Sequence, residues 1–209
     1  MPRASARRTT RSAEGGAPRP EAPAARPTVF TVGHSNRSTA ELLALLLQAR
    51  VGLLVDVRAF PHSRANPQFD AEVLGASLRA AGIAYRHLPA LGGRRRRDRH
   101  SPASPNTLWH HQAFRNYADY ALTGAFRDGL QELTALAAGN TTAIMCSEAV
   151  WWRCHRRIIT DYLLVAGLPV SHILGEKQIR AATLTPGAQP RADGSILYPE
   201  PPPGALNGA

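Results

Sequence analysis

Hydrophobic residues fall into two patterns along the chain, short continuous runs and stretches with helical spacing. The runs are rich in aliphatic and β-branched residues, which is typical of parallel strands covered on both faces. They lie at residues 28–32, 53–57, 83–88, 142–146 and 170–174. Between them, apolar positions recur three and four residues apart, as in amphipathic helices. This alternation predicts an α/β fold, with one mainly parallel sheet of about five strands and helices on both faces.

Local signals define several of the expected helices. Ser38 and Glu41 have the spacing of a capping box, in which each side chain bonds a backbone N–H at a helix start. Asn66-Pro67 is expected to begin another helix, because proline fits the first turn. Its predicted buried face, before Gly82 ends it, comprises Val73, Leu74, Leu78 and Ala81. Helical spacing also marks residues 114–121, 126–136 and 158–166, and a late strand is expected at 195–198.

The two ends of the chain differ in composition from this region. Residues 1–27 carry six arginines and five prolines, and apart from Met1 no aliphatic or aromatic residue larger than alanine. Such a segment buries too little apolar surface to offset its ordering entropy. The sequence therefore predicts a disordered tail at 1–27, one α/β domain at 28–198 and a flexible C-terminal tail at 199–209.

The chain of 209 residues is strongly basic, with a formal net charge of +10. A basic field attracts phosphates, so nucleic acid is a candidate partner. However, 24 of the 25 basic residues are arginine, and Lys177 is the exception. Together with the high content of alanine, proline and glycine, this usage also suits a coding bias toward GC-rich codons. The charge alone therefore does not establish a polyanion partner.

Other protein classes are disfavoured by composition. Two cysteines are too few for a disulfide scaffold, and the amino end lacks the apolar core of a signal peptide. No window of 18 apolar residues is present, so no membrane association is expected. A cytoplasmic location is the simplest expectation, with both thiols reduced and free.

Candidate chemistry is concentrated in residues 145–156. This stretch joins an expected strand to an expected helix and contains both cysteines, one glutamate, one histidine and two arginines. Open α/β sheets bind ligands at the carboxyl ends of their strands, which is where this stretch begins. The candidate catalytic residues are Cys146, Glu148, Cys154 and His155.

Helical geometry assigns a direction to each of these side chains. His155 falls on the apolar stripe and should face the protein, whereas Arg153 should point outward as a solvated charge. A cysteine in the first turn of a helix beside cations has a lowered pKa, which favours Cys154 as a thiolate. Cys146 is instead placed to meet a ligand at the strand end. The alternatives are a core histidine for His155 and a small buried hydrophobe for Cys146.

Metal binding is the competing chemistry, and it is disfavoured. Cys146 and Cys154 are eight residues apart rather than in a CxxC hook, and adjacent Cys154 and His155 on a helix are not expected to turn toward one ion. We therefore predict no metal ligands, and no cofactor is assigned. Cys146 and Cys154 could form a reversible pair if their geometry permits it.

The loops after the first four strands should converge. Right-handed crossovers place all of them at one edge of a parallel sheet. Asp56 is expected to pair with Arg58, which lies on the same face, and the loop that begins at Arg94-Arg95-Arg96-Arg97 is expected to cover the opening, with a solvated loop as the alternative. The candidate ligand-binding residues are Gly33, His34, Ser35, Asp56, Arg58, Ser63, Arg64, His87, Arg94 and Arg156.

Several short motifs resemble the family known as domain of unknown function 488. They are Gly33-His34-Ser35, Asp56-Val57-Arg58, His87-Leu88-Pro89, Leu91-Gly92-Gly93, Met145-Cys146 with Glu148, and Cys154-His155-Arg156. The likeness extends from about Thr28 to Tyr198. This chain departs at Trp151, where similar proteins more often have proline, and at Ser147, where alanine is frequent. The resemblance implies an α/β domain suspected of being enzymatic, with no established reaction.

Two functional hypotheses follow from the sequence. The first is a cysteine-dependent enzyme of unknown reaction, acting on a small anionic or nucleotide-like ligand through a Cys/Glu/His/Arg cluster at the carboxyl edge of the sheet. The alternative is a nucleic-acid-binding module that uses the arginine-rich loop and tail. The two differ in salt dependence, which is steep for a polyanion binder and shallower for a small enclosed site.

Overall fold

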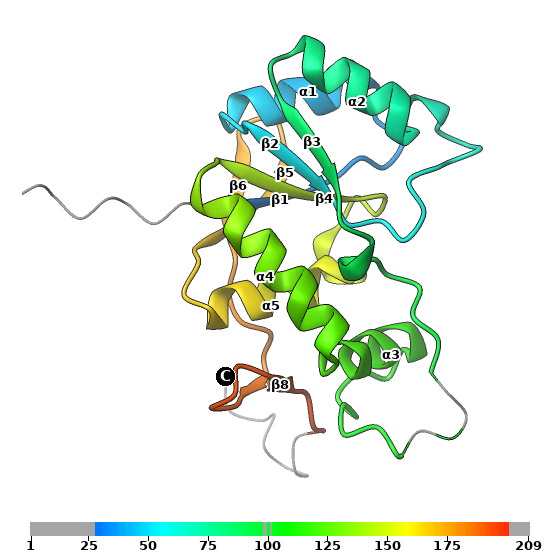
Figure 1. The fold of residues 1–209 in the computed structure, drawn as a ribbon, viewed down its shortest axis with the longest axis vertical. Coiled ribbons are helices and arrows are strands. Elements are labelled where there is room, and N and C mark those ends of the chain that lie inside the picture. Colours follow the sequence, from blue (N-terminus) through cyan, green and yellow to red (C-terminus); the bar gives the residue numbers. More distant parts are fainter. Residues whose placement is uncertain (1–27, 98–99, 101, 201–209) are drawn as a thin grey trace, which may run out of the picture.

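The computed structural model describes residues 28–97, 100 and 102–200, and within them the chain forms an α/β fold (Figure 1). The strands are β1 (Val29–Gly33), β2 (Leu53–Asp56), β3 (Ala84–His87), β4 (Thr142–Cys146), β5 (Val170–Gly175), β6 (Gln178–Ala181), β7 (Gln189–Pro190) and β8 (Ile196–Leu197). The α-helices are α1 (Thr39–Gln48), α2 (Ala71–Ala80), α3 (Gln112–Ala121), α4 (Gly124–Ala138) and α5 (Arg156–Val165). Three short 3₁₀-helices are η1 (Pro67–Phe69), η2 (Pro89–Leu91) and η3 (Trp151–Arg153). The predicted fold class is confirmed.

Six strands of this part of the chain form one sheet, in the order β3-β2-β4-β1-β5-β6. The first five in this order run parallel, and β6 pairs antiparallel with β5. All five predicted strands are present, and 142–146 matches β4 residue for residue. The prediction missed β6, because Gln178–Ala181 is an edge strand with every residue exposed. Such a strand needs no apolar run, so its sequence carries no burial signal.

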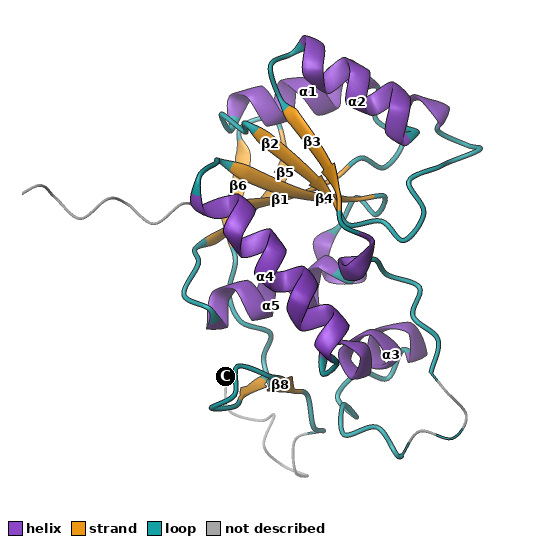
Figure 2. Cartoon of the chain, in the orientation of Figure 1, coloured by secondary structure: helices purple, strands orange, loops and turns teal. Residues whose placement is uncertain are grey.

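Helices cover both faces of the sheet, as predicted (Figures 1 and 2). Helices α1 and α2 lie on one face, where the core contains Leu42, Leu46, Leu74 and Leu78. Helices α3, α4 and α5 belong to a second and larger core that includes Ile144 from the sheet. Strands β1, β2, β4 and β5 each contribute residues to both cores. Across the described ranges, none of the helices combines the length and the apolar character required for a membrane span.

The two helices of the first layer show one confirmed start and one corrected start. The Ser38–Glu41 capping box is present, with the Glu41 backbone N–H donating to Ser38 and Glu41 accepting from the Ser38 backbone. The helix predicted to begin at Asn66-Pro67 begins instead at Ala71, because Pro67–Phe69 forms the separate turn η1. Phe69, the last residue of η1, is fully buried.

The predicted buried face of α2 was also partly wrong. Leu74 and Leu78 are buried together with Gly75, but Val73 is 51% exposed. With the helix starting at Ala71, Val73 lies one residue before the inward stripe and points toward solvent.

The C-terminal part of the described chain packs against the second layer. The predicted late strand is β8, which pairs with β7 in a separate two-stranded sheet rather than with the main sheet. Tyr198 fixes this end, since its hydroxyl donates to Asp161 at 2.9 Å and its backbone N–H donates to Asn106 at 2.9 Å. The tail predicted at 1–27 and most of the tail predicted at 199–209 lie outside the described residues.

Candidate active site

The carboxyl ends of three adjacent strands meet at one edge of the sheet. In the parallel register, Gly33 of β1 lies beside Cys146 of β4, and Asp56 of β2 lies beside Met145. A pocket of about 600 Å³ opens at this edge. Eight of the predicted site residues line it: His34, Arg58, Ser63, Arg94, Cys146, Glu148, Cys154 and His155. The loops after β1, β2 and β4 thus converge on one cavity, as the crossover rule requires.

The remaining predicted site residues lie behind or beside the lining. Gly33 backs the wall, because a Cβ at this position would overlap the carbonyl oxygen of Glu148. His87 donates through Nε2 to the carbonyl oxygen of Arg58 at 2.9 Å. Ser35 is half-buried and bonds Asn36, and Arg64 is exposed outside the pocket. Asp56 and Arg156 are almost completely buried and contact lining residues from behind.

An ion pair supports the floor of the pocket. Asp56 is fully buried and accepts from the guanidinium of Arg58 through Nε at 2.9 Å and through the terminal nitrogen at 2.5 Å. The Tyr85 hydroxyl donates to the same carboxylate at 2.8 Å, and Arg58 also donates to the carbonyl oxygen of Phe69 at 2.8 Å. The predicted Asp56–Arg58 contact is present. These contacts fix the guanidinium of Arg58, which also lines the pocket.

His34 contributes a neutral side chain next to this cation. Its Nδ1 lies 2.8 Å from the Ser35 carbonyl oxygen and must donate to it, so Nε2 is the unprotonated nitrogen in the neutral ring. Arg58 approaches Nε2 at 3.4 Å. Burial lowers the pKa of His34, and the positive charge of Arg58 lowers it further. The floor therefore carries the charge of Arg58 with a neutral imidazole beside it.

Two sulfur atoms and one imidazole meet at the other side of the pocket. The Nδ1 atom of His155 lies 3.8 Å from the sulfur of Cys146 and 3.6 Å from that of Cys154. Its Nε2 lies 2.9 Å from the carbonyl oxygen of Val57, which can only accept. In the neutral ring the proton therefore resides on Nε2, and the lone pair of Nδ1 points at the two sulfurs.

Arg156 holds this cluster from inside the protein. It is 1% exposed, its Nε donates to the Cys154 sulfur at 3.3 Å, and its terminal nitrogen donates to the Glu148 carbonyl oxygen. The guanidinium therefore ties the sulfur to the loop that follows β4. This position differs from the predicted ligand contact, because the helix carries Arg156 behind Cys154 rather than into the cavity.

The two thiols have opposite acidities. Burial alone would raise the pKa of Cys154, but the hydrogen bond from Cys146 and the charge and hydrogen bond of Arg156 lower it to about 6. The pKa of Cys146 is raised to about 12, first by a hydrogen bond to Cys154 and second by burial. Cys154 is thus the more acidic thiol of the pair. The pKa of Cys154 is lowered, as expected, but not by a position in the first turn of a helix. Cys154 precedes α5, and the cation beside it is Arg156.

Cys146, Cys154 and His155 could also hold a metal ion. Their two sulfur atoms and one imidazole nitrogen all lie within 4.8 Å of one another. Zinc with about 2.3 Å to sulfur and about 2.0 Å to nitrogen requires roughly 3.5–3.8 Å between tetrahedral ligand atoms, which fits the two sulfur–nitrogen separations. The expectation that adjacent Cys154 and His155 would not turn toward one point is wrong. Cys154 has extended backbone, with φ −127° and ψ 148°, and lies before the helix.

Several lining residues were not assigned by sequence. The mouth includes Phe60 and Trp152, which are 67% and 47% exposed, and α3 supplies Tyr117. The Tyr117 ring lies 5.0 Å from that of His155, and its hydroxyl donates to the Leu91 carbonyl oxygen at 2.7 Å. These positions share no local motif. They come from a loop, from η3 and from α3, which meet at one pocket through tertiary packing that no spacing rule indicates.

The double glycine Gly92-Gly93 was noted in the sequence only as part of a motif and was not assigned to the site. Gly93, in the double glycine after η2, lines the pocket, and a Cβ there would lie 2.9 Å from His155 Nδ1. A residue without a side chain is therefore needed for the imidazole to reach the sulfurs. Arg153, predicted to be solvated, is exposed and also reaches the rim of the pocket.

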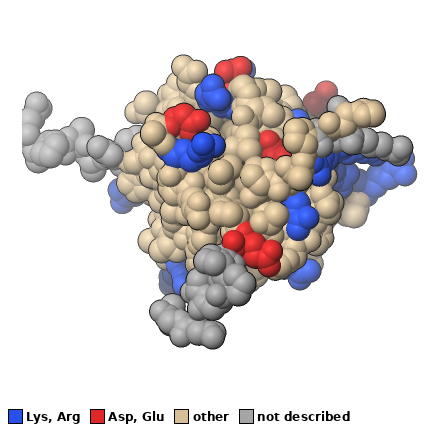
Figure 3. All heavy atoms as spheres, turned by 90° about the horizontal axis from the view of Figure 1, so that it is seen from below, with Lys and Arg blue, Asp and Glu red and all other residues tan. Residues whose placement is uncertain are grey.

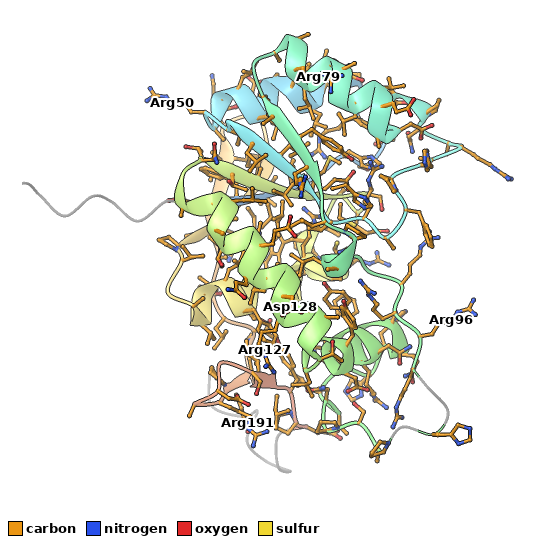
Figure 4. The ribbon with its side chains drawn as sticks, viewed as in Figure 1. Arg50, Arg79, Arg96, Arg127, Asp128 and Arg191 are labelled. Atoms are coloured by element: carbon orange, nitrogen blue, oxygen red, sulfur yellow. The ribbon has the colours of Figure 1, made fainter. Side chains whose placement is uncertain are left out.

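Only part of the arginine run faces the opening. Arg94 lines the pocket, but Arg95 donates to the carbonyl oxygens of Gly92 and Pro89 and stacks on Tyr120 at 3.8 Å. Arg97 lies 3.9 Å from Asp119, and Arg96 points away from the fold (Figure 4). Toward the middle of the face seen from below, basic side chains are isolated among acidic and uncharged ones, and more of them lie at its right edge (Figure 3). Arg95 and Arg97 thus contact other groups of the protein, whereas Arg94 faces the pocket.

Comparison with known proteins gives a family and no activity. No curated protein and no solved structure matches the chain. The family described as "Domain of unknown function DUF488" matches residues 38–163, more than half of the chain. The match includes α1, the Asp56–Arg58 pair and the whole cysteine cluster. The chain therefore belongs to the DUF488 family.

Proposed function

We propose that this protein is a cysteine-dependent enzyme that acts on a small anionic, nucleotide-like ligand, with Cys154 as the nucleophile. One observation carries the proposal. The Cys154 sulfur lines the pocket while it lies 3.3 Å from a guanidinium nitrogen of Arg156 and 3.6 Å from the imidazole of His155. A sulfur with a fixed cation on one side and an open cavity on the other is arranged as a thiolate for covalent chemistry.

The charge of the pocket favours an anionic ligand. Among the described lining residues, Arg58, Arg94 and Arg153 carry positive charge and Glu148 carries negative charge. Arg58 is 5% exposed and already oriented by Asp56, so it offers a pre-organised hydrogen-bond donor to a carboxylate or phosphate. An oriented donor loses little entropy on binding, which favours recognition at this position.

The mouth of the pocket favours a flat ring. Phe60 and Trp152 line the opening, yet 67% and 47% of these side chains are exposed to solvent. Exposed aromatic side chains at a pocket gain apolar contact when a planar group stacks on them. A nucleotide-like molecule combines such a ring with an anionic end. Stacking on an aromatic residue contributes about 1–3 kcal/mol per base in nucleic-acid complexes.

Two groups are placed for proton transfer in this proposal. The unprotonated Nδ1 of His155 faces the sulfurs and is a general base, held in its tautomer by Val57. Glu148 is exposed at the pocket wall and, as a carboxylate, is positioned to accept a proton on the solvent side.

Alkylation kinetics test the nucleophile. Because the pKa of Cys154 is lowered to about 6, we expect its reaction with iodoacetamide to stay fast at pH 7 and to fall as the pH drops below about 6. Peptide mapping assigns the modified residue. Cys146→Ser retains a hydroxyl donor to Cys154 and serves as the matched control, in which the profile should persist. A Cys154 profile centred near pH 8.5, the value of an ordinary thiol, would refute the thiolate.

Ligand binding tests the substrate class. Calorimetry should show that adenosine monophosphate binds more tightly than either adenosine or inorganic phosphate, and that Trp152→Ala weakens binding of the nucleotide but not of phosphate. Binding should depend weakly on salt. Tight binding of an oligonucleotide with a steep salt dependence would instead favour a nucleic-acid-binding module.

Metal analysis of the freshly purified protein completes the test. Native mass spectrometry should give the mass of the chain with both thiols open to alkylation. One equivalent of zinc that protects Cys146 and Cys154 from iodoacetamide would assign these sulfurs to a metal and overturn the nucleophile.

A further inference from the structure

The second thiol of the cluster has no task in the chemistry proposed above. Cys146 is 6% exposed, lines the same pocket as Cys154, and lies at the end of β4. Its sulfur and that of Cys154 lie within 4.8 Å of each other, with Nδ1 of His155 3.8 Å from Cys146. Both cysteines are free. To form a disulfide bond the two sulfurs must approach from this separation to about 2.05 Å.

We propose that Cys146 and Cys154 form a dithiol–disulfide couple that reduces a small acidic disulfide bound in the pocket. This inference rests on the proposed function, because Cys154 makes the first attack. It adds the substrate class, a disulfide with carboxylate groups and a flat ring or another group that fits the aromatic mouth. The product is a protein disulfide together with two thiol fragments of the substrate.

The first step is attack by the Cys154 thiolate on one sulfur of the substrate. A bond forms between Cys154 and that sulfur, the substrate disulfide breaks, and the other half leaves as a thiolate. Arg58 and Arg94 hold the carboxylates of the substrate during this step. Glu148 lies on the solvent side, where the first fragment departs.

The second step is attack by Cys146 on the mixed disulfide. Nδ1 of His155 takes the proton of the Cys146 thiol, and the resulting thiolate bonds to the Cys154 sulfur. The bond between Cys154 and the substrate fragment breaks, and this fragment leaves as a thiolate that accepts the proton from His155. The two cysteines lose two electrons and the substrate gains them, so atoms, protons and electrons balance.

The positions of the two cysteines set the order of the two steps. Nε of Arg156 lies 3.3 Å from the Cys154 sulfur, so this cation stabilises the thiolate that makes the first attack. The Cys146 sulfur lies 3.8 Å from Nδ1 of His155, which takes its proton once the mixed disulfide has formed.

Burial also defines the reductant that returns the protein to its starting state. Cys146 and Cys154 are 6% and 3% exposed and line a pocket of about 600 Å³. A cavity of this size admits a small molecule but not the surface of a protein partner. The reductant is therefore a low-molecular-weight thiol, two molecules of which restore both cysteines and leave as their own disulfide.

The test uses dithiobis(nitrobenzoate), an aromatic disulfide with carboxylate groups whose fragments are coloured. The full-length protein should release two fragments. The second release should be first-order and independent of reagent concentration, and intact mass should show the loss of two hydrogens without an adduct. In Cys146→Ser we expect one release and a stable adduct on Cys154, and in Cys154→Ser a reaction slower by about tenfold or more. A low-molecular-weight thiol should restore both thiols of the wild type.

The outcomes separate the two proposals. An adduct that persists on Cys154 in the wild type, or two adducts without a disulfide, would overturn the couple and leave Cys154 as the nucleophile. Fast reaction of Cys154→Ser together with slow reaction of Cys146→Ser would overturn the nucleophile itself. Circular dichroism and the unfolding midpoint of both serine variants must match those of the wild type. If either variant is unfolded, mapping the disulfide and the transient Cys154 adduct in the wild-type protein at limiting reagent decides the same question.

Discussion

Replacement of Asp56 by asparagine removes the negative charge beneath the pocket floor while keeping the size of the side chain. Asp56 is fully buried, and its carboxylate accepts from the backbone N–H and guanidinium of Arg58 and from the Tyr85 hydroxyl. Arg58 is 5% exposed, so its charge would remain inside the protein without a counter-ion. Loss of one partner from a buried ion pair costs about 3–5 kcal/mol, and we expect this decrease in the free energy of unfolding.

Urea unfolding followed by far-UV circular dichroism measures this cost. With a slope of about 2 kcal/mol per molar urea, the midpoint of Asp56→Asn should fall by roughly 1.5–2.5 M. Tyr85→Phe removes a single hydrogen bond to the same carboxylate and should cost about 1 kcal/mol, which separates the charge from the hydrogen-bond network. The double variant Asp56→Asn/Arg58→Met should be more stable than Asp56→Asn, because it removes the unpaired charge as well.

Two results would contradict this account. A cost below about 1 kcal/mol for Asp56→Asn would show that solvent or another group neutralises Arg58. A double variant no more stable than Asp56→Asn would show that the cost arises from packing rather than from charge. If the reasoning is correct, Asp56→Asn should also weaken binding of a small anion, since Arg58 would lose its orientation.

Three further changes have defined outcomes. Gly33→Ala should displace the loop at Glu148 and reduce the rate of Cys154 alkylation, because its Cβ would lie 2.7 Å from the Glu148 carbonyl carbon. In the control Gly52→Ala the new Cβ meets no atom within 4 Å, so the rate should stay unchanged. Equal alkylation rates in the two variants would contradict this packing. Burial, with Arg156 and Arg180, lowers the pKa of His172 to about 4, so the folded protein stays neutral there while the unfolded chain takes up a proton near pH 6.5. The contribution of neutral His172 to the free energy of unfolding is complete above pH 6.5 and is lost as the pH falls toward 4. In His172→Gln the urea midpoint should therefore depend less on pH across this range. Tyr198→Phe should lower the free energy of unfolding by about 1–3 kcal/mol, since it leaves the buried Asp161 without a 2.9 Å hydrogen bond; an unchanged urea midpoint would refute this role.

Local rules recovered most of the fold. The capping box at Ser38, the strand at 142–146 and the Asp56–Arg58 pair depend on residues within four positions of one another, so their physics is visible in sequence. The edge strand β6 was missed because none of its residues is buried. Burial, rather than pairing, is what hydrophobic patterns report.

Eight of the predicted site residues line one pocket, but their geometry was not predicted. Cys154 and Arg156 were assigned to one regular helix, whereas the chain is extended at Cys154 and the helix begins at Arg156. This difference turns the cysteine toward His155 and places Arg156 behind it. Tyr117 was not found because the packing of α3 on the strand ends is a tertiary event. Nothing in the spacing of residues 112–121 indicates which surface that helix covers.

The Arg58 network also bears on how the specificity of this protein can evolve. The guanidinium is held by Asp56 at the end of β2 and by the Phe69 carbonyl oxygen, so its position is built into the core. Phe60 and Trp152 at the mouth are exposed, Phe60 on a loop and Trp152 on the short 3₁₀-helix η3. Substitutions at the mouth therefore cost little stability and leave the position of Arg58 unchanged. Under the proposed function, selection can change the shape of the accepted molecule at these two positions, while the preference for negative charge is inherited with the fold itself.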